Sequence, residues 1–198
     1  MPKVVDHELR RREIIEVVWR LIATDGLEAV TTRRIAEAAG ASNGSLLYYF
    51  KSKDEVVTAA FEHVFSATNI RTDAASPSRH GLAGLRILCL EIMPLDVERL
   101  LEARIVMTFW EQALTKPERS ELFNATMSTW RVEMSHRLEE ARADGDLKPN
   151  VDIREAVDEL MSMLMGLQVL GVHTPGEATA ARQLAQLDAF FERLRPGR

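Results

Sequence analysis

The sequence has very few of the features that support disulfides, membrane spans or export. Its 198 residues include one cysteine, Cys89, which excludes an internal disulfide and suits a reducing cytoplasm. The N-terminus is polar and charged, without the apolar segment of a secretory signal. The longest apolar stretch, residues 160–172, is too short to cross a membrane and contains Ser162 and Gln168. These absences predict a cytoplasmic protein without a membrane segment.

Sequence patterns for catalysis or metal binding are missing as well. The five histidines never lie three or four residues apart, so no helical metal site of the HExxH type is expected. The chain has neither a glycine-rich phosphate loop nor a nucleophile elbow. Glu139 and Glu140 stand among Arg137 and Arg142, a pattern typical of a solvated helix face rather than a catalytic pair. We therefore expect no enzyme activity, no metal and no cofactor.

The most informative segment is residues 31–50, which predict two short helices joined at Gly40. Thr32 is expected to cap the first helix and Ser42 the second. Gly40 supplies the left-handed residue that ends the first helix. The second helix begins with small polar residues, which allow its backbone and side chains to approach base edges in a major groove. The segment is predicted to be a helix-turn-helix, with double-stranded DNA as its partner.

The polar residues of this segment divide into two groups by the contacts that suit them. Base contacts are expected from Arg33, Asn43 and Ser45, with Gly44 allowing close approach. Hydroxyl and ammonium donors fix the register on phosphates without reading sequence. The expected phosphate contacts are Thr32, Tyr48, Tyr49 and Lys53, and the cap Ser42 completes the DNA-binding set.

The chain resembles a known family over about residues 8–68. The positions that carry the resemblance are Ile22, Gly26, Thr32, Ile35, Ala36, Ala39, Gly40, Ser42, Gly44, Leu46, Phe50 and SKDE at 52–55. They are similar to the N-terminal domain of the TetR family of bacterial repressors, and the YYF ending is closer to the BetI-like branch. The family usually has tyrosine where this chain has Leu47, so Tyr48 or Tyr49 must carry more of that phosphate contact. The resemblance implies a three-helix head and a C-terminal helical domain for ligand binding and dimerisation.

Charge is unevenly distributed along the chain. Residues 1–53 carry nine Lys/Arg and seven Asp/Glu, a net charge of +2. The other residues carry sixteen and twenty-three, a net of −7, and the two sum to −5 for the whole chain. Because the head is only mildly basic, tight DNA binding requires two heads with good geometry, which favours a dimer.

Every remaining segment predicts helix, so an all-α fold of about nine helices is expected. A first helix spans about residues 6–25, and a capping box of Ser52 and Glu55 opens another that continues to about Arg71. A loop is expected at residues 72–80. Further helices are predicted at 81–93, 96–114, 117–143 and 152–173, with a last one opened by Thr174 and Glu177 and ending near Arg195. The domains are expected at 1–53, the head, and 54–198, the regulatory and dimerisation domain, with the helix after Ser52 as connector.

The last two predicted helices have more apolar surface than one partner would cover. Residues 160–172 place apolar side chains on almost every face of their predicted helix. The final helix has a heptad-like apolar seam. A second copy of the chain would cover both helices in a four-helix interface, as the family resemblance implies; an ordinary internal core is the alternative. The expected interface residues are Leu167, Leu184, Leu187, Phe191 and Leu194.

Methionine and tryptophan are concentrated in the middle helices, where they could line an adaptable apolar cavity. The expected lining residues are Met107, Trp110, Glu111, Met127, Trp130, Met134 and Met163. A plain helical core accounts for the same residues. The sequence does not identify the ligand.

These features predict a homodimeric transcriptional repressor whose operator affinity is controlled by an unidentified small molecule. The alternative is a helical ligand-binding or protein-scaffolding module whose helix-turn-helix no longer binds DNA. The intact tip at residues 43–45 and Lys53 favour the regulator. Leu47 and the low charge of the head favour the alternative.

Overall fold

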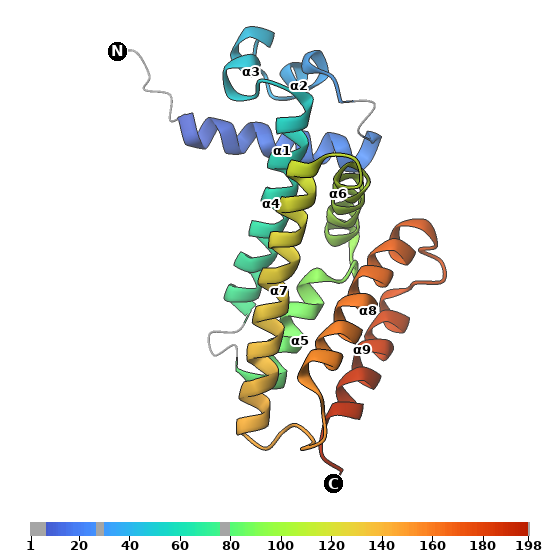
Figure 1. Cartoon of the computed structure of the whole chain (residues 1–198). Coiled ribbons are helices and arrows are strands. Elements are labelled where there is room, and N and C mark those ends of the chain that lie inside the picture. Colours follow the sequence, from blue (N-terminus) through green and yellow to red (C-terminus); the bar gives the residue numbers. More distant parts are fainter. Residues whose placement is uncertain (1–6, 27–29, 76–79, 198) are drawn as a thin grey trace.

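The computed structural model describes residues 7–26, 30–75 and 80–197, and the side chains of Glu8, Asn43, Leu47 and Lys53 lie outside this description. Within these residues the fold consists of nine helices without a strand (Figure 1), which confirms the expected all-α class. The helices are α1 His7–Asp25, α2 Thr32–Ala38, α3 Asn43–Tyr49, α4 Lys53–Ala75, α5 Gly81–Ile92, α6 Val97–Ala113, α7 Pro117–Ala143, α8 Ile153–His173 and α9 Ala180–Leu194. No helix in the described ranges has the length and apolar character needed to cross a membrane.

The helices form two tiers joined by α4, which runs from the head into the larger tier (Figure 1). The first hydrophobic cluster combines α1, α2 and α3 with the first half of α4 and the end of α6. Within it, the Phe61 ring of α4 stacks on the Phe109 ring of α6, with centroids 4.0 Å apart. The second cluster is formed mainly by α5, α7, α8 and α9. The apolar core of the head therefore continues past residue 53 into α4 and α6.

The caps of the two short head helices follow the predicted pattern, with one correction. Ser42 caps α3, because its hydroxyl accepts a hydrogen bond from Ser45 N at 3.1 Å. Gly40 has φ +59 and lies in the turn, as expected. The cap of α2 is Thr31 rather than Thr32, since Thr31 has extended backbone and its hydroxyl accepts from Arg34 N. Thr32 is instead the first helical residue.

The connector α4 begins as predicted and extends further than predicted. Ser52 Oγ accepts from Glu55 N at 3.1 Å, and Glu55 reaches back to Lys51 N at 2.8 Å. The helix continues to Ala75, so residues 72–75 are helical rather than part of the expected loop. Residues 76–79 of that expected loop lie outside the described ranges. At 1.5 Å per residue, the 23 residues of α4 make a rod of about 35 Å.

The last helix begins later than the Thr174–Glu177 pattern predicts. Thr174 is the C-terminal cap of α8, and its hydroxyl donates back to Leu170 O at 3.0 Å. The segment after it forms a turn in which Glu177 N donates to Thr174 O. The cap of α9 is Thr179, whose hydroxyl accepts from Arg182 N.

Glu140 holds the start of α5 to α7 and is not the solvated residue that its neighbours in sequence suggest. His80 precedes α5 without making a side-chain cap. Glu140 Oε2 instead accepts from Gly81 N at 3.0 Å and pairs with Arg137 Nη1 at 2.9 Å. The Gly81 hydrogen bond, reinforced by Arg137 and opposed by burial, lowers the pKa of Glu140 from 4.5 to about 2. An acidic side chain from another helix thus caps α5.

Glu140→Gln is expected to reduce the dependence of stability on pH in the acid range. Because the folded state lowers this pKa, the stabilisation is present above pH 4.5 and is lost as the pH falls towards 2. We expect a loss of about 1–2 kcal/mol at neutral pH, allowing for screening by water, and a flatter profile between pH 4.5 and 2. Urea unfolding at a series of pH values measures this profile. Glu139→Gln, at the exposed neighbouring position, is the control; equal profiles for the two variants would contradict the assignment.

Candidate DNA-binding head and regulatory groove

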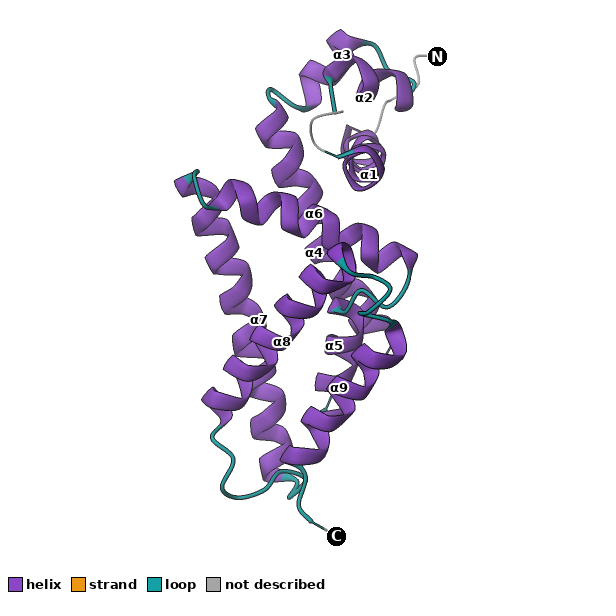
Figure 2. Ribbon diagram, turned by 90° about the vertical axis from the view of Figure 1, so that its right-hand side faces the viewer, coloured by secondary structure: helices purple, strands orange, loops and turns teal. Residues whose placement is uncertain are grey.

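The short helices α2 and α3 lie at one end of the molecule (Figure 2). Thr32, Ser42, Gly44 and Ser45 are all exposed. The Arg33 side chain is 82% exposed and pairs with Glu37 on its own helix, Nε to Oε1 2.8 Å. An exposed pair of this kind contributes little stability, so Arg33 can exchange Glu37 for another partner.

Two tyrosines and a histidine form a ring cluster beside this polar face. Tyr48 is 71% exposed and meets the half-buried Tyr49 edge-on, with ring centroids 5.4 Å apart. The His7 ring, at the start of α1, lies 5.5 Å from Tyr48 and 6.2 Å from Tyr49. Its Nδ1 is 3.5 Å from the Tyr49 hydroxyl. The sequence analysis did not select His7, because nothing local connects residue 7 with residue 49.

Two further arginines, Arg10 and Arg34, join the helices of the head to one another. Arg10 of α1 donates from Nη2 to Ala39 O at 2.7 Å, and so binds the turn between α2 and α3. Arg34 pairs with Asp25 at 2.5 Å, which links α2 to the end of α1. Of the predicted DNA contacts, Asn43 and Lys53 have side chains outside the described part, so only their helical backbone positions are known.

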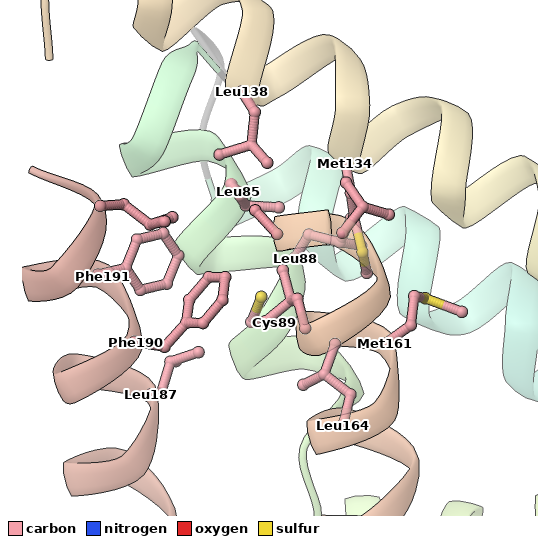
Figure 3. Packing of buried hydrophobic residues seen from close by; sticks show 14 of the residues in the cluster. Leu85, Leu88, Cys89, Met134, Leu138, Met161, Leu164, Leu187, Phe190 and Phe191 are labelled. Carbon is pink, nitrogen blue, oxygen red and sulfur yellow. The ribbon is translucent and has the colours of Figure 1, made fainter. Parts of the chain in front are cut away.

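Four of the five predicted dimer residues lie inside the core of the single chain. Leu167, Leu187, Phe191 and Leu194 are between 0 and 7% exposed, and Leu184 is half-buried. Figure 3 shows Leu187, Phe190 and Phe191 of α9 directed towards α5. The heptad-like seam thus seats α9 on its own chain, which corrects the expectation that these buried side chains face a partner. The larger exposed apolar residues of α8 are Val169 and Leu170.

The predicted ligand-lining residues do not surround one cavity. Trp110 packs on the head cluster, where its ring lies 6.0 Å from Phe123. Met127, Trp130, Met134 and Met163 belong to the other cluster, and Met134 is fully buried (Figure 3). Met107 is half-buried and Glu111 is exposed. The predicted residues do not form one cavity because the methionines and tryptophans of α6 and α7 pack against different hydrophobic clusters.

One of these residues, Trp130, does line a groove, of about 470 Å³, between α4 and α7. Its other lining residues are Asn69, Thr72, Asp73, Leu88, Ser128, Thr129, Val132 and Glu133. Trp130 Nε1 is buried and has no acceptor among the described residues. The Trp130 ring also contacts Phe65 of α4, with centroids 5.4 Å apart. The groove therefore has an aromatic wall, polar walls from both helices and a leucine from α5.

In the same stretch of α4, Arg71 joins this helix to α5 and α6 through a network of alternating charges. Arg71 contacts Glu102 of α6 through both terminal nitrogens, at 2.8 and 2.7 Å. Its Nε donates to Glu91 of α5 at 2.7 Å, and Glu91 in turn pairs with Arg99 of α6. Burial raises the pKa of Glu102, opposed by the hydrogen bond from Arg71. Sequence reasoning missed this network because its members lie 20 and 31 residues apart.

A helix-turn-helix head on an all-α chain is the arrangement of a DNA-binding transcriptional regulator. Two family models cover most of the chain: bacterial regulatory proteins of the tetR family match residues 14–60, and the BetI-type transcriptional repressor C-terminal domain matches residues 82–196. The chain belongs to the TetR family. Members of this family are regulators rather than enzymes, and they bind DNA operators and small-molecule effectors.

Individual relatives agree with this assignment. The chain is 29% identical to the regulator PksA of Bacillus subtilis over 176 residues, which are 88% of this chain and 84% of that one. It is 29% identical to BetI of Burkholderia lata over 194 residues, 93% of this chain and 94% of the relative. A regulator of Saccharomonospora viridis, solved in complex with choline, has the same fold with a TM-score of 0.87 at 22% identity, covering 96% of this chain and all of that one.

Proposed function

We propose that the chain is a homodimeric repressor in the bacterial cytoplasm that leaves its operator when a small molecule binds between α4 and α7. The observation that carries the proposal is the exposed polar face of a capped α3 on a head whose connector, α4, also forms a wall of the groove. The description of the matching C-terminal family model, BetI-type transcriptional repressor, supports the direction of control.

In this proposal the head reads DNA with residues of α2 and α3. Arg33, Asn43 and Ser45 contact base edges, and the missing side chain of Gly44 allows the backbone to come close. Phosphates are held by Thr32, Tyr48, Tyr49 and Lys53, with Ser42 holding the tip in shape. The exposure of Thr32, Arg33, Ser45 and Tyr48 supports this division.

The α4–α7 groove is the proposed effector site because a ligand there touches the connector directly. Asn69, Thr72 and Asp73 of α4 face Trp130 and its neighbours on α7. A larger groove of about 870 Å³ lies between α7 and α8, but its walls are mostly charged and include no residue of α4. The Saccharomonospora regulator was solved in complex with choline, which supports a small molecule of about that size as the effector here.

The homodimer is proposed to form through the outer surface of α8 and α9. Val169 and Leu170 are 37% and 48% exposed, on the helix that would carry the interface in this family. Two heads supply the phosphate contacts that a single head with a net charge of +2 lacks. Half-sites about 34–36 Å apart, or a multiple, are expected for such a dimer.

Alanine variants of Asn43 and Lys53 are expected to weaken DNA binding in different ways. Asn43→Ala should cost about 1–3 kcal/mol on the best site and relax sequence preference. Lys53→Ala should weaken binding to all sequences and reduce the salt slope by about one. Gel-shift titrations on the chain's own upstream region, at several salt concentrations, measure both effects.

Arg154→Ala is the matched control, since α8 begins at the end of the molecule far from the head (Figure 1). Unchanged operator affinity in both head variants would contradict the placement of α3 in the groove. Wild-type protein without any sequence-specific binding would favour the scaffolding alternative.

A further inference from the structure

The α6–α7 hairpin holds both α1, the first helix of the head, and the start of α4, the helix that connects the head to the rest of the chain. Arg104 of α6 donates from Nη1 to Ala23 O at 3.0 Å. Ala23 lies in the last turn of α1, where carbonyl groups have no partner within the helix. A cation at a helix C-terminus is also favoured by the helix dipole. Arg104 therefore serves α1 as a cap from outside the head.

The second contact of the hairpin is with the first turn of α4. Arg119 Nη2 donates to Asp54 O at 2.8 Å and lies 3.0 Å from Asp54 Oδ1. Lys116, just before α7, pairs with Asp54 Oδ2 at 2.6 Å. The Lys116 hydrogen bond, with further attraction from Arg119, holds the pKa of Asp54 below its ordinary value. Asp54 directly follows Lys53, a proposed phosphate contact. The interactions of Arg119 and Lys116 with Asp54 therefore lie next to the proposed DNA-binding surface.

Stability alone does not explain why a buried position such as 119 carries an arginine. The residue is 4% exposed, and its guanidinium carbon lies 5.9 Å from the centre of the Phe109 ring. Its Nη1 is buried and has no hydrogen-bond partner in the described ranges. Burying a cation with an unpartnered donor is costly, and an apolar side chain would fill the same space at lower cost.

The helix that carries Arg119 also forms one wall of the α4–α7 groove. α7 is continuous from Pro117 to Ala143, and Trp130 lies eleven residues, or about 16 Å, beyond Arg119. A ligand that displaces the α7 wall of the groove would displace Arg119 and its hold on Asp54. This path to the head needs no bending of α4.

We propose that Arg119 is a positioning residue: together with Lys116 and Arg104 it sets the orientation of the head, and α7 transmits groove occupancy to it. The inference rests on the proposed function, because it assigns the route between ligand and operator. Arg119 itself touches neither DNA nor ligand.

Distances between spin labels on the head and on α7 test the proposal directly. Ala38→Cys and Glu121→Cys provide exposed sites on α2 and α7. The native Cys89 does not interfere, since it is fully buried and burial raises the pKa of its thiol to about 12. Labelled protein is diluted with unlabelled protein so that only distances within one chain are measured. Operator affinity and the melting temperature are recorded for the same variants.

Arg119→Gln is expected to broaden the head-to-α7 distance distribution and to lower operator affinity by about 2- to 30-fold. Arg119→Lys, which keeps a cation near Asp54, should recover part of both. The matched control is Arg131→Gln, which removes another α7 arginine–aspartate pair, directed at Asp158 of α8. It should leave the distance distribution unchanged.

A folded Arg119→Gln variant with the wild-type distance distribution would overturn the proposal. If that variant does not fold, Arg119→Met, which fills much of the same space without donating to Asp54, tests the same contact. An unchanged distribution in this variant would overturn the proposal equally. The distance measurement needs no DNA, so a failure of the operator-binding proposal is recognised separately, as wild-type protein that binds no specific site.

Discussion

Glu102→Ala is expected to destabilise the protein by about 3 kcal/mol, because it leaves Nη1 and Nη2 of Arg71 without their bidentate partner. The Glu102 side chain is 8% exposed and that of Arg71 25%, so water replaces the lost contacts poorly. The pair joins the far half of α4 to α6, and Glu91 alone would then hold Arg71. Urea unfolding followed by circular dichroism measures the loss.

The control for this prediction is Glu98→Ala, one helical turn earlier on α6 and exposed. That change should stay within about 0.5 kcal/mol of wild type, as is usual for surface positions. Arg71→Lys should be intermediate, since an ammonium cannot form the planar double contact with the carboxylate. Equal stability of Glu102→Ala and Glu98→Ala would show that the network contributes little.

Gly171→Ala is expected to destabilise by about 1–3 kcal/mol through overpacking. A Cβ atom at Gly171 would lie 2.7 Å from Pro94 Cγ and 3.2 Å from Pro94 Cβ. The proline ring cannot rotate away, so α8 or the α5–α6 connection must shift. The nearby glutamines make a shift costly, because Gln183 donates to Pro94 O and Gln168 to Ile92 O, both at 3.3 Å.

A double-mutant cycle with Pro94→Ala identifies the clash as the cause. Removing the ring should make Gly171→Ala less costly in that background, so the two changes should be non-additive. Thermal unfolding of the four proteins measures the coupling. Strict additivity would place the cost of Gly171→Ala elsewhere.

Features that depend on neighbouring residues were predicted well. The α7 bounds agree with the structure, and α8 begins at Ile153, one residue after the predicted start at 152. Ser42 caps α3, and the Ser52–Glu55 box opens α4. These contacts span three or four residues, so the helix geometry alone brings their atoms together. The one-residue error at Thr31 arises because two adjacent threonines can each serve as a cap.

Features that depend on which face of a helix meets which neighbour were not predictable. An apolar seam looks the same whether it faces a second chain or its own core, and here Leu187 and Phe191 face α5 and α8. The predicted pocket residues do not lie together for a related reason. Trp110 and Trp130 are on different helices and pack against different hydrophobic clusters. The contact by which Arg104 caps α1 joins residues 81 positions apart, so no local pattern indicates it.

The sequence by itself determined the helical class, the head with its glycine hinge and its polar tip, and membership of a family of DNA-binding regulators. Short-range capping, helical periodicity and a specific residue pattern are sufficient for those conclusions. Only the tertiary structure decided which carboxylates meet Arg71, which helices form the groove beside Trp130, and that Arg119 holds Asp54. Arg71 is 20 and 31 residues from its two carboxylates and Arg119 is 65 residues from Asp54, so long-range packing, not local preference, brings these groups together.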